Sequence, residues 1–148
     1  MARRVQSINS LLSKLPSEDD DNYTIALKNI VLENDFFNRV SDLETYLNSP
    51  SSQYGFAAFY SLLIICRELN YYSKYNSYVD KYGERFNTYK LYQVVLSTFY
   101  RNKGILGEKD KFRYAIRFAE AACEALPTNL AVKHHYAAMV VTQTSQLV

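Results

Sequence analysis

The sequence predicts an all-α protein of about eight helices, paired as successive antiparallel hairpins. Apolar residues recur at helical spacing through most of the chain, and no stretch alternates convincingly with a period of two. Glycine and proline together make up about 5% of the 148 residues, against roughly 12% in an average protein. These few breakers fall between the periodic stretches, so we expect them to mark the ends of helices.

The breakers place the elements in order along the chain. A first helix at 3–15 ends at Pro16, and the acidic stretch 17–21 supplies capping residues for the next helix. The remaining helices are expected at 22–33, 36–48, 54–69, 71–84, 88–103, 110–125 and 130–143. We expect a single domain over 1–148, in which 1–16 and 130–143 cap the two ends and the hairpins span 22–50, 54–87 and 88–127.

The later hairpins repeat. Leu62, Leu63 and Cys66 correspond, at a shift of 34 residues, to Leu96, Ser97 and Tyr100, and a further shift of 40 leads to Tyr136, Ala137 and Val140. The longer second interval is explained by a six-residue loop insertion in 102–110, the segment that contains Gly104 and Gly107.

The segment 115–127 resembles the second helix of a tetratricopeptide repeat. Its small residues Ala115, Ala119 and Ala122 are followed by Pro127, where the repeat closes. The resemblance covers about 88–140, is partial over 54–87, where Tyr75 and Tyr82 replace small residues, and is limited to helix rhythm before residue 54. It implies a right-handed stack of hairpins, a TPR-like α-solenoid, with wider helix spacing beside the two tyrosines.

The resemblance also implies a partner-binding groove, because the first helix of each pair lines the concave surface in that family. Carried over to this sequence, the groove residues are Tyr60, Ile64, Arg67, Leu91, Val94, Thr98, Arg101, Asn102, His134 and Ala138. Arg67 and Arg101 stand one repeat apart and are expected to pair with an acidic side chain or carboxylate on the partner. We therefore expect a non-enzymatic adaptor, co-chaperone or regulatory module that binds a protein or peptide segment.

Catalytic and metal chemistry are not expected. Cys66 follows four apolar residues, which should raise the pKa of its thiol, and Cys123 also lies in an apolar helical pattern, so both are predicted to be reduced structural thiols. His134 and His135 lie about 100° apart on a helix, with one facing solvent or the groove and the other the edge of the core. The aspartates of 17–21 lack the spacing of a calcium loop. We predict no catalytic residue, no metal and no cofactor.

Two alternatives to peptide binding remain open. Basic residues interleave with aromatic ones over 85–117, a combination that can bind RNA or another anion. An apolar terminal helix could instead pack on its counterpart in a second copy of the chain. No apolar run approaches the roughly 18 residues of a membrane span. We expect a cytoplasmic protein, with organellar import through residues 1–15 as the alternative.

Overall fold

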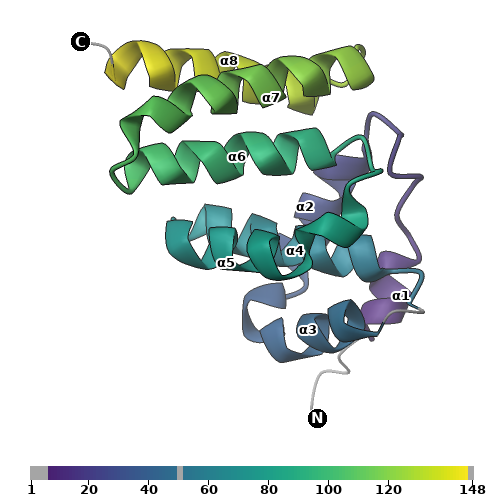
Figure 1. The fold of residues 1–148 in the computed structure, drawn as a ribbon. Coiled ribbons are helices and arrows are strands. Elements are labelled where there is room, and N and C mark those ends of the chain that lie inside the picture. The colour runs from purple at the N-terminus through teal and green to yellow at the C-terminus, as the bar shows by residue number, and fades with distance from the viewer. Residues whose placement is uncertain (1–6, 50–51, 147–148) are drawn as a thin grey trace.

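The structure is a computed structural model that describes residues 7–49 and 52–146. These residues contain no strand, which confirms the all-α prediction. Eight α-helices follow one another (Figure 1): α1 (Ile8–Leu12), α2 (Tyr23–Glu33), α3 (Val40–Asn48), α4 (Gly55–Glu68), α5 (Tyr72–Tyr82), α6 (Tyr92–Ile105), α7 (Phe112–Ala125) and α8 (Leu130–Gln146).

The helices form a layered stack along the molecule. Figure 1 shows α6, α7 and α8 lying side by side at one end, with α7 packed against both of its neighbours. Helices α1 and α3 lie toward the opposite end, and α4 and α5 lie between the two groups. Helix α4 contacts α2, α3 and α5, so it occupies the centre of the N-terminal half.

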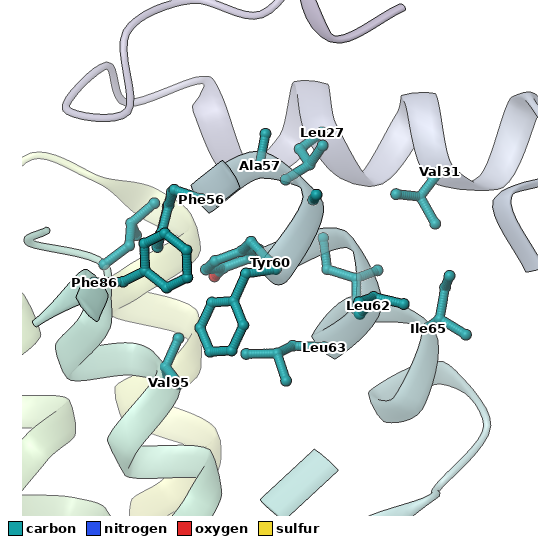
Figure 2. Close-up of a cluster of buried hydrophobic side chains, with 14 of the residues drawn as sticks. Leu27, Val31, Phe56, Ala57, Tyr60, Leu62, Leu63, Ile65, Phe86 and Val95 are labelled. Carbon is teal, nitrogen blue, oxygen red and sulfur yellow. The ribbon is translucent and has the colours of Figure 1, made fainter. Parts of the chain in front are cut away.

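Helix α4 is buried on all of its faces. Every residue from Gly55 to Cys66 is buried, as expected for a helix that is apolar all round. In Figure 2, Leu27 and Val31 of α2 lie on one side of α4, and Val95 of α6 lies on another. The core is therefore built around α4, and only its C-terminal turn reaches solvent.

The C-terminal end of α4 is set by Asn70, which has a left-handed backbone with φ of 57°. Asparagine tolerates this conformation better than most residues, and it ends helices much as glycine does. The N–H of Tyr71 then donates to the carbonyl of Cys66 at 2.8 Å, which satisfies one of the free carbonyls of the last turn. This stop places Arg67 in the exposed final turn of an otherwise buried helix.

Polar contacts between loops bring the start of α2 near the start of α8. The Thr128 hydroxyl donates to Asp21 Oδ2 at 2.9 Å across 107 positions of sequence. Asn129 caps α8, since its Oδ1 accepts a hydrogen bond from the N–H of Val132 at 3.1 Å. Asp21, at the end of the acidic stretch before α2, thus contacts the loop before α8.

Several predicted boundaries need correction. Within the described residues the first helix covers only Ile8–Leu12, and the part of the expected 3–15 helix before residue 7 lies outside them, as does the expected stop at Pro50. The stretch 36–48 is divided into a 3₁₀ turn, Phe36–Asn38, and α3. The helix expected at 88–103 begins later, at Tyr92, and continues to Ile105.

Gly104 lies inside α6 and not in the predicted loop insertion. A Cβ atom at this position would lie 2.6 Å from the ring of Phe112, the first residue of α7. Glycine is therefore needed for the close approach of the two helices. The helix end expected at residue 103 lies two residues later, at Ile105, so Gly104 is the next-to-last residue of α6.

The two bulky tyrosines of α5 each donate a hydrogen bond to a neighbouring helix. The hydroxyl of Tyr75 donates to the carbonyl of Val95 at 3.2 Å, which links α5 to α6. The hydroxyl of Tyr82 donates to Asn48 Oδ1 at 3.0 Å, which links α5 to the end of α3. Both side chains are buried, so each hydroxyl needs a partner of this kind.

Candidate functional site

A pocket of about 550 Å³ lies between α2, α4, α6 and α8. This volume is in the range of sites that hold a small ligand or the anchoring side chains of a peptide. Its lining is mainly apolar, with Leu63 and Ile64 from α4, Val94 from α6, Ile25 from α2 and Ala138 from α8. The other lining residues are Thr24, Lys28, Tyr60, Arg67, Glu68, Tyr75, Leu130, Ala131, His134 and His135.

The expected groove residues lie around this pocket and two smaller recesses. Those that line the pocket itself are Tyr60, Ile64, Arg67, Val94, His134 and Ala138. Leu91 lines an adjoining recess together with Arg67 and His135. The residues Thr98, Arg101 and Asn102 line a second recess, again with Arg67. Arg67 is therefore common to all three spaces.

Six of the ten expected groove residues are buried, namely Tyr60, Ile64, Leu91, Val94, Thr98 and Asn102, and the last-named pair and Leu91 do not line the main pocket. The exposed fractions of Leu91, Thr98 and Asn102 are 1%, 1% and 2%. Asn102 instead donates from Nδ2 to Asn76 Oδ1 at 3.1 Å, and Asn76 donates to the carbonyl of Phe99 at 3.1 Å. This buried network holds α5 against α6, so the role of Asn102 is structural.

Helix α2 contributes a side of the pocket that the sequence did not identify. Thr24, Ile25 and Lys28 line it, and Lys28 Nζ lies 3.1 Å from Glu68 Oε1 at the end of α4. The region before residue 54 shows only helical rhythm, which predicts a helix but not its neighbours. No sequence pattern therefore indicated that these three residues line the pocket.

Arg67 and Arg101 are two positive charges that lie close enough to influence each other. Neither guanidinium has a carboxylate within ion-pair distance in the part of the chain that the structure describes. Burial lowers the pKa of Arg101, and the charge of Arg67 lowers it further. Arg101 Nε is buried and has no hydrogen-bond partner within the described ranges. A negatively charged ligand would relieve this repulsion.

His135 is the buried member of the histidine pair. Its side chain is 5% exposed, and its Nε2 lies 2.7 Å from Ser97 Oγ. Burial lowers the pKa of His135 to about 3, and the charges of Arg67 and Arg101 add to this effect, so the ring is neutral at physiological pH. His134 is exposed at the pocket. This confirms that one histidine faces the groove and the other the core.

The missed signal for His135 is its helical register. Val132, His135 and Met139 recur at the spacing of one helix face, and all three are buried. The same periodicity that defined α8 could have shown which histidine is internal.

Both cysteines are free thiols; Cys66 lies in the buried apolar environment that the sequence predicted, whereas Cys123 is only half-buried. Cys66 is a buried free thiol, and burial raises its pKa to about 11. Burial also raises the pKa of Cys123. Within residues 7–49 and 52–146, no group of three or more histidine, cysteine or acidic side chains is placed to hold a metal ion.

The aromatic rings of the basic stretch 85–117 are largely engaged within the fold. Phe99 is buried, and Tyr100 stacks on Phe118 with ring centroids 5.4 Å apart. Tyr114 is half-buried, and three basic side chains lie over its ring, those of Lys111, Arg113 and Arg117. Few ring faces remain for base stacking, which favours a packing role for these aromatics.

No helix among the described residues has the length and apolar character needed to cross a bilayer. Comparisons of the chain with protein-family models, with curated proteins and with solved structures found no match.

Proposed function

We propose that this chain is a non-enzymatic interaction module that binds a segment of a partner protein in the pocket between α2, α4, α6 and α8. The observation that carries the proposal is the combination of a mainly apolar lining with Arg67, an accessible cation that has no acidic neighbour at ion-pair distance in the described residues. Apolar contacts supply most of the affinity of such sites, and an arginine fixes the orientation of the ligand.

The order of the lining helices supports the resemblance to tetratricopeptide repeats. The pocket is lined by alternate helices, with Tyr75 of α5 as the exception. In a TPR-like solenoid the first helix of each pair faces the concave side, which would produce this alternation. An adaptor, a co-chaperone or a regulatory domain would each use such a surface.

The test is a selection of short random displayed peptides on the immobilised chain, followed by affinity measurements on the enriched sequences. Ala138→Trp places a large ring at the pocket from an exposed position of α8. Ala137→Trp is the matched control, because Ala137 is also exposed but does not line the pocket. We expect Ala138→Trp to weaken binding by about tenfold or more and Ala137→Trp to leave it unchanged.

Two outcomes would contradict the proposal. The first is that no peptide is enriched over an unrelated helical protein. The second is that enriched peptides bind both tryptophan variants as tightly as the unmodified chain, since they would then bind elsewhere on the surface.

A further inference from the structure

The hydrogen bonds of Ser97 determine which nitrogen of His135 carries the proton. Ser97 Oγ donates its single proton to the carbonyl of Ala115 at 2.6 Å. Its 2.7 Å contact with His135 Nε2 must therefore be one in which the serine oxygen accepts. The ring is protonated at Nε2, and Nδ1 is left as an acceptor with a free lone pair.

This acceptor is unused. His135 Nδ1 is buried and has no hydrogen-bond partner in the described part of the chain, although His135 is among the residues that line both the pocket and the recess beside it. An unpaired buried acceptor costs free energy that an incoming N–H or O–H donor would recover. The occupant of the pocket is therefore expected to supply a donor.

The charges beside His135 require a second feature of the occupant. Arg67 lines the same pocket and recess as His135, and Arg67 and Arg101 share the next recess. Lys28 forms an ion pair with Glu68, but the two arginines have no acidic partner at ion-pair distance among the described residues. A carboxylate on the occupant would complete this part of the site with charge-assisted hydrogen bonds.

We propose that the occupant is an extended peptide segment with an acidic side chain beside apolar ones. A main-chain N–H of the segment donates to His135 Nδ1, and its carboxylate is held by Arg67, with the positive charge of Arg101 in the recess behind it. Apolar side chains on the segment pack on Leu63 and Val94. An extended segment fits better than a helix, because the N–H groups of a helix beyond its first turn are already bonded within the helix.

This inference rests on the proposed function and uses peptides enriched on the unmodified chain, synthesised with amidated C-termini so that only side chains supply a carboxylate. Replacing the acidic residue of the peptide with its amide should weaken binding about tenfold. This difference should disappear when the same peptides are measured on Arg67→Gln. Lys133→Gln removes one charge from an exposed position of α8 outside the pocket, and it should retain the full difference.

A scan in which single peptide amides are replaced by esters tests the donor to His135. One position should lose affinity about fivefold when its N–H is removed, and this sensitivity should be absent in His135→Leu. If that variant does not fold, the ¹⁵N resonance of His135 Nδ1 in the unmodified chain gives the same information. It should move when the amide peptide binds and should not move with the ester.

The outcomes separate this inference from the proposed function. If no peptide is enriched, the proposed function fails. If peptides bind in the pocket but tolerate loss of the acid and every ester, the inference is overturned while the proposed function stands. Tighter binding by helix-stapled versions of the same peptides would also overturn it, because a helical occupant would leave His135 Nδ1 without a main-chain donor.

Discussion

Acidification from about pH 7 to about pH 5 is expected to destabilise this protein through His135. The side chain is 5% exposed, and its pKa in the folded state is about 3 against an ordinary value of 6.5. At a pH between these two pKa values, the unfolded chain binds a proton at His135 and the folded chain does not. The free energy of unfolding therefore falls as the pH drops below 6.5, and it continues to fall until about pH 3.

The size of the effect follows from the two pKa values. At pH 7 most unfolded chains carry a neutral His135, so the loss of free energy of unfolding due to His135 is close to zero. At pH 5 nearly all unfolded chains are protonated at this residue while folded chains are not. Each pH unit within the interval is worth about 1.4 kcal/mol, so the expected loss between pH 7 and pH 5 is about 2 kcal/mol.

Urea denaturation at both pH values measures this loss. His135→Gln cannot titrate, so its free energy of unfolding should change about 2 kcal/mol less between pH 7 and pH 5 than that of the unmodified chain. His134→Gln is the matched control, because it removes an exposed histidine one position away, and it should behave as the unmodified chain does. The comparison uses the change with pH, so a uniform loss of stability in His135→Gln does not affect it.

The reasoning would be refuted if His135→Gln and the unmodified chain lost the same free energy over this interval. Such a result would mean that His135 is protonated in the folded state despite its burial beside Arg67 and Arg101. The neutral Nδ1 acceptor on which the peptide inference depends would then not exist at pH 5.

Three further predictions concern the packing of the helices. Gly104→Ala should destabilise the protein by about 1–2 kcal/mol, measured by urea denaturation, because the clash with Phe112 outweighs the gain in helix propensity; unchanged or higher stability would contradict the close packing of α6 and α7. Tyr75→Phe should cost about 1 kcal/mol in the same assay through loss of the hydroxyl's bond to the α6 backbone, and a neutral result would show that this bond contributes nothing. A thiol reagent should modify half-buried Cys123 before buried Cys66, as followed by peptide mass spectrometry, because burial raises the pKa of Cys66 to about 11; equal rates in the folded protein would contradict this burial.

The positions of the helices were predictable because helix formation depends on residues three and four apart. The helix expected at 110–125 appears as a short 3₁₀ turn followed by α7, and those expected at 22–33 and 54–69 appear as α2 and α4 within a residue at each end. Gly104, the next-to-last residue of α6, shows the limit of this local reasoning, because its close contact with α7 was not predicted. Whether a glycine ends a helix or permits a close contact depends on what lies opposite, and the ring of Phe112 lies opposite Gly104.

The candidate site was predictable only in part. Tyr60, Arg67 and Val94 line the pocket as the repeat pattern implied, because their positions follow from helix register within single elements. Thr98 and Asn102 share that register but line a separate recess beside α5 and not the main pocket. The sequence pattern is the same in both cases, and only the neighbouring helix decides which positions reach the pocket.

The sequence alone determined an all-α chain, the approximate span of each helix and the inert character of Cys66, because these depend on short-range periodicity and local apolar surroundings. Only the tertiary structure decided that α2 and α8 line the same pocket, and that Arg67 and Arg101 share a recess without an acidic partner at ion-pair distance in the described residues. These features arise from contacts between segments far apart in the chain, such as Asp21 with Thr128. Such contacts depend on how whole helix faces fit together, and no local pattern encodes that fit.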